Sequence, residues 1–319
     1  MNNTRRELLL GIGLTLATAP LVKVLAATAA FDISRDTVGN FNYIYNNSSY
    51  RDEFYTFLTN VFHLYPEDKL HELIYKLNQQ ELLDQSIYKN LQASLPELKP
   101  LFADFTYAIP ALSKQKKIIA EQTSQLVDSN KRYDGYLEVG STGRYLDSLE
   151  ETLDIKGDTF FLTDKRATYS PIDIVDRGQI AKAGKDIDLE NYDSKLSSHI
   201  PNKSIGLATV YIGFHHCPLT LREEFITSIR DTMKDDAPLI LRDHDAHDEK
   251  MSHMVALAHD VFNMGTNETW AYNDAELRHF YSLAELETMM NQYGFKSDDR
   301  KIYQQGDPTL NALMVFRKN

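Results

Sequence analysis

The chain of 319 residues contains only one cysteine, Cys217. A single thiol cannot form an intramolecular disulfide, and it cannot supply a cysteine-based zinc or iron–sulfur site. Cys217 stands between two histidines and Pro218 at an expected strand end, where packing is favoured over nucleophilic chemistry.

Positive charge is also scarce. The 34 lysines and arginines face 46 acidic residues, so the net charge is -12. This balance disfavours a broad nucleic-acid surface, because phosphate binding needs a concentrated basic face. The hydrophobic share of 42% and the charged share of 25% are typical of a globular protein with a substantial core.

The longest apolar run lies at the N-terminus. Residues 1–29 begin with a short polar stretch that contains Arg5 and Arg6, and they continue with an apolar run that only Lys23 interrupts. This order predicts an export signal rather than an element of the fold. The stretch TRRELLL resembles a twin-arginine signal, which implies the twin-arginine export machinery as a partner. If the signal is functional the protein is exported to the periplasm, and otherwise it is cytoplasmic; an uncleaved amphipathic helix is the alternative.

Residues 30–113 show helical spacing and no alternation typical of strands. Large apolar residues recur at intervals of three and four, as at Phe54, Phe57 and Leu58, and again at Leu70, Leu73, Ile74 and Leu77. We expect this part of the chain to form a helical cap or lead-in. Nothing in it identifies a ligand.

From residue 114 to 319 apolar strand-like segments alternate with amphipathic helices. The segments YLEV, TFFLTD, IGLATVYIGF and PLILRD predict strands, and a closing antiparallel pair is expected around QQGDP. Thr220 with Glu223, and Ser282 with Glu285, predict capping boxes at two helix starts. Gly265 and Gly294 are placed to end helices. Such alternation favours a doubly wound α/β fold: a largely parallel sheet with helices on both faces.

Glycines and polar residues follow the predicted strands at their carboxyl ends, in LEVGSTGRY, FFLTD, YIGFHHC and ILRDHD. In open α/β sheets, ligands bind beyond the carboxyl ends of the strands. We therefore expect the ligand-binding site at the carboxyl ends of these strands.

With these elements in order, residues 114–319 resemble a class I S-adenosylmethionine-dependent methyltransferase. The resemblance implies a Rossmann-like seven-strand sheet whose last strand is antiparallel. It also implies S-adenosylmethionine as the cofactor and a small molecule or a protein as the methyl acceptor. The sequence does not identify that acceptor.

The resemblance implies that a glycine-rich turn lies under the methionine part of the cofactor and that an acid after the second strand binds its ribose. The matching acid is Asp164, and Asp186 or Asp188 matches the family's acid near the adenine. Gly143 departs from the family's alternate spacing, and it leaves side chains at Thr142 and Arg144. The expected cofactor residues are Glu138, Gly140, Ser141, Thr142, Gly143, Arg144, Asp164 and Ile212.

Histidines and aspartates cluster after the strands at Phe214 and Asp243. Imidazole titrates near neutrality, so His216 or His244, steered by an aspartate, is a candidate general base that takes a proton from the acceptor. The alternative is that these side chains cap the following helix. The candidate catalytic residues are His215, His216, Asp243, His244 and Asp245.

Two other functions compete with methyl transfer. The same cluster suits a zinc- or manganese-dependent hydrolase, although HDAHDEKMSH has no recognised ligand spacing, so we assign no metal ligands. The irregular glycine spacing and the export signal instead favour a non-catalytic, adenosyl-binding descendant of the fold. Export also conflicts with methyl transfer, because S-adenosylmethionine is made and kept in the cytosol.

Overall fold

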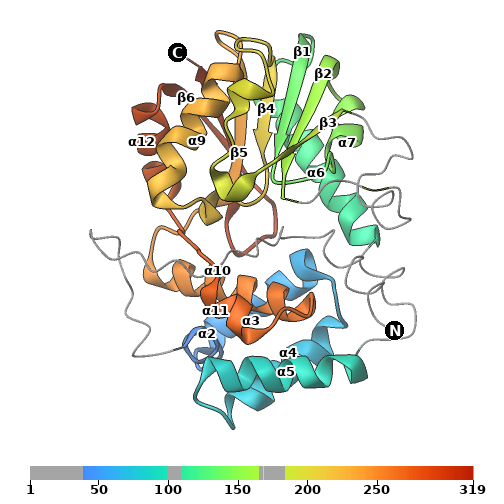
Figure 1. Cartoon of the computed structure of the whole chain (residues 1–319). Coiled ribbons are helices and arrows are strands. Elements are labelled where there is room, and N and C mark those ends of the chain that lie inside the picture. Colours follow the sequence, from blue (N-terminus) through green and yellow to red (C-terminus); the bar gives the residue numbers. More distant parts are fainter. Residues whose placement is uncertain (1–38, 99–108, 165–167, 169–183, 319) are drawn as a thin grey trace.

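The computed structural model describes residues 39–98, 109–164, 168 and 184–318. The predicted signal segment, residues 1–29, lies outside these ranges, and the prediction of export is untested. Figure 1 shows two layers, with a sheet and its flanking helices above a group of helices. Among the described helices, none combines the length and the apolar composition that a membrane span requires.

The upper layer is built on a seven-stranded sheet with the order β3-β2-β1-β4-β5-β7-β6. Strands β1 to β5 pair in parallel, whereas β7 runs antiparallel to both β5 and β6. The predicted fold class, a doubly wound Rossmann-like sheet with an antiparallel last strand, is confirmed. The strands are β1 (Arg132–Val139), β2 (Asp154–Thr163), β3 (Lys185–Asp188), β4 (Leu207–Val210), β5 (Pro238–His244), β6 (Phe295–Tyr303) and β7 (Asn311–Lys318).

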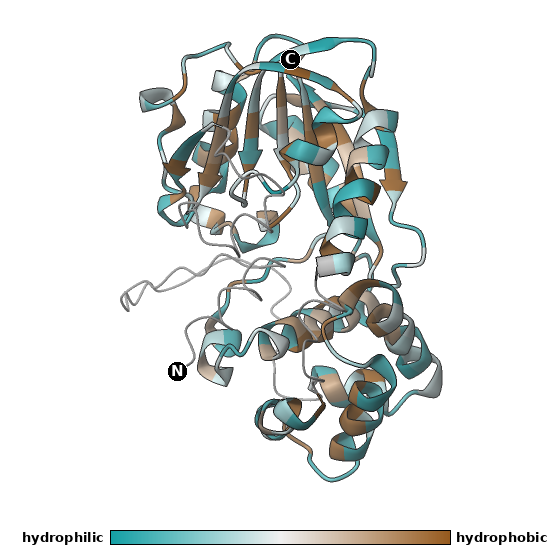
Figure 2. Cartoon of the chain, turned by 90° about the vertical axis from the view of Figure 1, so that its right-hand side faces the viewer, coloured by the Kyte–Doolittle hydropathy of each residue, from teal (hydrophilic) through white to brown (hydrophobic). Residues whose placement is uncertain are grey.

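Two apolar cores lie on opposite faces of the sheet, because successive side chains of a strand point to opposite sides. In β1, Leu137 and Val139 pack with helices α9 and α12, whereas Tyr133 and Tyr136 pack with helices α6 and α7. Figure 2 shows the apolar residues concentrated on the strands between these helices. The flanking helices are α6 (Ile109–Leu126), α7 (Leu146–Glu150), α9 (Leu219–Thr232) and α12 (Leu283–Gln292).

The helical structure predicted for residues 30–113 is confirmed for residues 40–98, whose helices lie in the lower layer; residues 109–113 begin α6, which packs on the sheet. Two later helices, α10 and α11, complete the same layer, and α10 shares its apolar core with the N-terminal helices (Figure 1). We expected residues 114–319 as a whole to form the α/β fold, so the place of α10 in the lower layer is a finding. The helices are α2 (Asn40–Tyr45), α3 (Ser48–Phe57), the π-helical turn η1 (Leu58–Phe62), α4 (Glu67–Asn78), α5 (Asp84–Leu98), α10 (Glu249–Gly265) and α11 (Trp270–Ala275).

The local signals have mixed outcomes. Ser282 and Glu285 form the predicted capping box of α12, and Gly294 follows that helix with a φ of 84°. The capping box at Thr220 is wrong: α9 already begins at Leu219, after Pro218, and no side chain caps it. Thr220 is therefore the second residue of the helix, and it cannot act as the N-cap, which is the residue that precedes the first helical one.

Candidate functional site

A cavity of about 100 Å³ lies where the two layers meet. Its wall is formed by the segments that follow β1 and β4, the end of β5, and residues of η1 and α10. The apolar part of the wall comes largely from the lower layer. The polar part is dominated by His215, His216, Arg242, Asp243, His244 and His259.

The chain after β4 positions the first two histidines. The predicted strand to Phe214 ends earlier, at Val210, and Gly213 then takes a left-handed φ of 88°. Glycine adopts this conformation without a steric penalty, and it leads into the short 3-10 turn η5 (Phe214–His216). Phe214 is buried in the sheet core, so the turn is anchored and its two histidines face the cavity.

Each of these histidines is held through Nδ1. His215 Nδ1 lies 2.8 Å from Asp243 Oδ1, and His216 Nδ1 lies 2.7 Å from the carbonyl oxygen of Leu277. Burial acts to raise the pKa of Asp243, but neighbouring His215 and the hydrogen bonds to the carboxylate lower it below its ordinary value. Asp243 is therefore ionised at neutral pH. A carboxylate and a carbonyl can only accept, so both Nδ1 atoms carry protons.

His244, the last residue of β5, is held in the same way. Its Nδ1 lies 2.9 Å from the carbonyl oxygen of Thr309, which fixes the proton on Nδ1. Burial lowers the pKa of His244 to about 4, so this ring is neutral at pH 7. We expected Asp243 to orient the ring of His216 or of His244. In the structure it is hydrogen-bonded to the ring of His215 instead.

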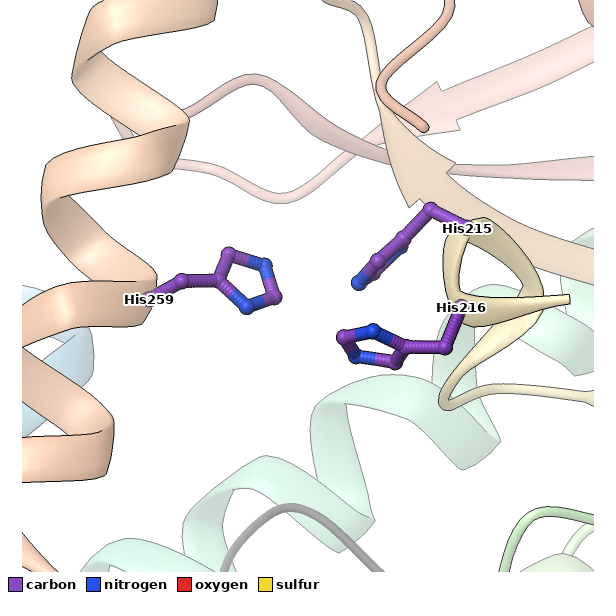
Figure 3. Close-up of side chains that lie close together, drawn as sticks. All are labelled: His215, His216 and His259. Carbon is purple, nitrogen blue, oxygen red and sulfur yellow. The ribbon is translucent and has the colours of Figure 1, made fainter. Parts of the chain in front are cut away.

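His259 of α10 completes the cluster, and we did not expect it from the sequence. Its ring centroid lies 4.8 Å from that of His215 and 5.6 Å from that of His216. Burial, followed by the charges of His215 and Arg278, lowers its pKa well below the ordinary value. The available signal was a histidine within the apolar spacing of Val255 and Phe262. Figure 3 shows the three rings converging from α10 and from the turn after β4.

The wall around the cluster is braced by a buried ion network. Arg278 donates to Asp260 Oδ1 and Glu276 Oε2, both at 2.8 Å, and to Asn273 Oδ1 at 2.6 Å. These bonds tie α11 and the segment after it to α10. They also fix the position of Leu277, whose carbonyl oxygen accepts the hydrogen bond from His216 Nδ1.

The glycine turn after β1 has a different character. Glu138 is fully buried, and its carboxylate accepts hydrogen bonds from Tyr136, from Ser141 and from the backbone N–H of Tyr145. Burial raises the pKa of Glu138, and these hydrogen bonds oppose the rise. The glutamate therefore holds the shape of the turn.

Both glycines of the turn have left-handed backbones, with φ of 87° at Gly140 and 86° at Gly143. A Cβ on Gly140 would lie 2.4 Å from the carbonyl oxygen of Ile212, and one on Gly143 would lie 2.6 Å from the ring of Phe161. The glycines thus make room for the protein's own strands. Arg144 is also buried.

The other predicted cofactor residues lie at the same edge. Gly140 N donates to Leu162 O at 2.9 Å, so the turn and Asp164 stand at the ends of neighbouring strands. Gly140, Thr142 and Asp164 stay partly exposed, and Ile212 lines the cavity.

Asp245 and Cys217 serve the fold instead. Asp245 accepts from Leu283 N at 3.0 Å and from Tyr303 Oη at 2.7 Å, so it fixes the start of α12 and does not steer an imidazole of the cavity. Cys217 is fully buried in the sheet core, and burial raises the pKa of its thiol to about 12. The expected packing role of this thiol agrees with both observations.

Comparisons with known proteins complete the description. No family model and no curated protein matches the sequence. Among solved structures, the chain is similar to the pyocyanin biosynthetic protein PhzM, with 11% identity, 86% of this chain and 74% of that chain covered, and a TM-score of 0.46. It is also similar to 1,6-didemethyltoxoflavin-N1-methyltransferase of Burkholderia thailandensis, with 11% identity, 66% and 79% covered, and a TM-score of 0.43. A third similar structure is the mitomycin 7-O-methyltransferase MmcR, with 11% identity, 79% of this chain and 67% of that chain covered, and a TM-score of 0.44. At these identities and scores the likeness adds nothing to what the strand order itself establishes.

Proposed function

We propose that this protein is an S-adenosylmethionine-dependent methyltransferase that binds its methyl acceptor in the histidine cavity. The observation that carries the proposal is the sheet order β3-β2-β1-β4-β5-β7-β6 with an antiparallel β7. In this order an acid-and-glycine turn ends the central strand β1, and a second acid ends its neighbour β2. Ligands of such sheets bind at this edge.

The residues at this edge fit the cofactor in placement. The partly exposed positions Gly140, Thr142 and Asp164 form a ledge between buried neighbours. On this proposal the turn would hold the methionine part, and Asp164 would accept hydrogen bonds from the ribose hydroxyls, as an ionised carboxylate can. Glu138 is excluded from direct contact, because it is fully buried and bonded within the turn. When bound, S-adenosylmethionine supplies an activated methyl group.

The cavity favours an acceptor that donates hydrogen bonds. His216 and His244 both have the proton on Nδ1, so their neutral rings can offer only the Nε2 lone pair to a ligand. Asp243 orients the ring of His215 in the same way. An acceptor with an O–H or N–H group satisfies these nitrogens, whereas a carbonyl or an ether does not. The chain would thereby align the acceptor, which is the main contribution that an enzyme makes to an in-line displacement.

Calorimetric titration with S-adenosylhomocysteine tests the proposal. Wild-type protein should bind it, and Asp164→Ala should weaken binding by about 10- to 100-fold, because a hydrogen bond to a charged group contributes roughly 1.5–3 kcal/mol. Asp158→Ala is the matched control, since Asp158 belongs to the same strand but its side chain is 70% exposed beside Lys185. Absence of binding by the wild type, or equal affinity in Asp164→Ala, would refute the proposal.

A further inference from the structure

We infer that His215, His216 and His259 form a binding site for a divalent transition-metal ion of the zinc class. One ligand nitrogen of each ring lies within 4.8 Å of the other two, and the rings converge on one point (Figure 3). This inference goes beyond methyl transfer and does not depend on it. With a metal bound, Nε2 of His215 and of His216 would be metal ligands, and the acceptor would then meet His244 and the fourth position of the metal.

The hydrogen bonds of the first two rings prepare them for a metal. Metal-binding histidines usually donate their second ring N–H to a carboxylate or a backbone carbonyl, which fixes the ring and aims the other nitrogen at the ion. His215 does this with Asp243, and His216 does it with Leu277. Both rings therefore present Nε2 to the same space.

That space lacks a partner for these nitrogens. Within the described part of the chain, His215 Nε2 and His259 Nδ1 are buried without a hydrogen-bond partner. Each residue is only 8% exposed, so water does not readily replace that partner. His216 Nε2 lies 4.0 Å from Glu276 Oε1, too far for a hydrogen bond. A buried polar atom without a partner costs about 1–3 kcal/mol. A cation shared by the three rings would remove this cost at His215 Nε2 and His259 Nδ1.

The charges around the cluster suit a cation. The negative charge of Asp243 stands directly behind His215. The positive charge of Arg278 is balanced by Asp260 and Glu276.

The donor set selects the class of metal. Three imidazoles suit zinc and its first-row neighbours, whereas magnesium and calcium prefer oxygen ligands. Zinc–nitrogen bonds of 2.0–2.1 Å at tetrahedral angles place ligand nitrogens about 3.3 Å apart. Ligand nitrogens up to 4.8 Å apart must therefore approach one another by as much as about 1.5 Å. His259 Nδ1 has no hydrogen-bond partner among the described residues that would oppose such a shift. Three protein ligands leave a fourth position for water or a substrate group.

The test uses the full chain without a polyhistidine tag, dialysed against zinc and analysed by mass spectrometry. We expect one zinc per chain, and we expect the visible spectrum of four-coordinate cobalt when cobalt replaces zinc. His259→Ala should weaken zinc binding by roughly 100-fold or more, and Asp243→Asn by about 10- to 100-fold. His247→Ala is the control, because this half-exposed ring belongs to the same histidine-rich segment but not to the cluster.

His216→Ala keeps the test valid if His259→Ala does not fold, since His216 lies on the short turn and is less deeply buried. Loss of zinc in either folded variant, with retention in His247→Ala, supports the site. No zinc in the wild type, or unchanged zinc in both cluster variants, would overturn it. Binding of S-adenosylhomocysteine is measured on the same samples, so a failure of the proposed methyl transfer is recognised separately.

Discussion

The glycine turn after β1 and the histidine cavity after β4 and β5 lie at the same edge of the sheet, yet the buried carboxylate of the turn and the buried imidazoles of the cavity differ in how their polar atoms are satisfied. In the turn, the buried carboxylate of Glu138 has three donors within the protein. In the cavity, buried nitrogens of His215 and His259 have no partner among the described residues. A buried polar group that has all its hydrogen bonds holds the local backbone in place, whereas a buried polar group without a partner needs an explanation, and a bound ligand is one. The difference indicates that Glu138 supports the turn, and on the proposed function the cavity receives the methyl acceptor.

The largest expected effect comes from removing the brace of the cavity. Arg278→Ala would leave Asp260 and Glu276 buried without their partner, and breaking a buried pair in this way costs about 3–5 kcal/mol. The free energy of unfolding, measured in urea, should fall by that amount. Arg300→Ala is the control, because its ion pair with Asp298 lies at the surface and should contribute about 1 kcal/mol or less. Equal losses in the two variants would show that the cavity wall needs no brace.

A smaller effect should follow from adding a methyl group to the turn. Gly140→Ala must bear a left-handed φ and a contact of 2.4 Å with a backbone oxygen, which together should cost about 2–4 kcal/mol. Gly306→Ala is the matched control. Its φ is 74°, but the atom nearest to the new Cβ is the end of the flexible Asn60 side chain at 3.0 Å, so about 1–2 kcal/mol is expected.

If Gly140→Ala were no worse than Gly306→Ala in thermal or urea unfolding, the close approach of β4 to the turn would be unimportant. The glycine would then be explained by a ligand rather than by the fold. That result would reverse the roles assigned to the two regions.

The pH dependence of stability gives the smallest of the three effects. Burial raises the pKa of Glu138 in the folded protein, so the folded state binds its proton more tightly than the unfolded state does. The contribution of this group to stability is therefore largest below the unfolded pKa, and it declines as the pH rises through the folded pKa. Glu138→Gln should flatten the loss of stability above about pH 4.5, by about 1.4 kcal/mol for each unit of pKa difference.

Unfolding free energies measured from pH 4 to 8 test this. Ser141→Ala serves as the companion variant, because it removes a donor that stabilises the ionised carboxylate and should steepen the same decline. Identical slopes in the wild type and Glu138→Gln would contradict a buried, titrating Glu138.

The sheet could be predicted from the sequence because its signals are local. Apolar runs that stop at Gly140, Asp164 and Asp243 mark strand ends, and parallel strands bring those ends to one edge. The pairing of Gly140 N with Leu162 O shows that the turn and Asp164 lie side by side, as that logic requires.

The metal cluster could not be predicted in the same way, because it depends on which layer α10 joins. A helix between two strands is expected on the sheet, but Met254, Val255 and Val261 pack with the N-terminal helices, which turns His259 toward η5. The prediction that Asp245 is catalytic was not supported for a related reason. It lies two residues after Asp243, but β5 has ended by then, and the chain has turned toward the start of α12.

The most direct measurement is a crystal structure of the protein with bound S-adenosylhomocysteine. The account predicts that the ligand lies over residues 140–143, with its ribose at Asp164 and its sulfur facing His215 and His216. An adenosyl group bound elsewhere, or strand ends that stay empty at saturating ligand, would contradict the claim that this edge carries out methyl transfer.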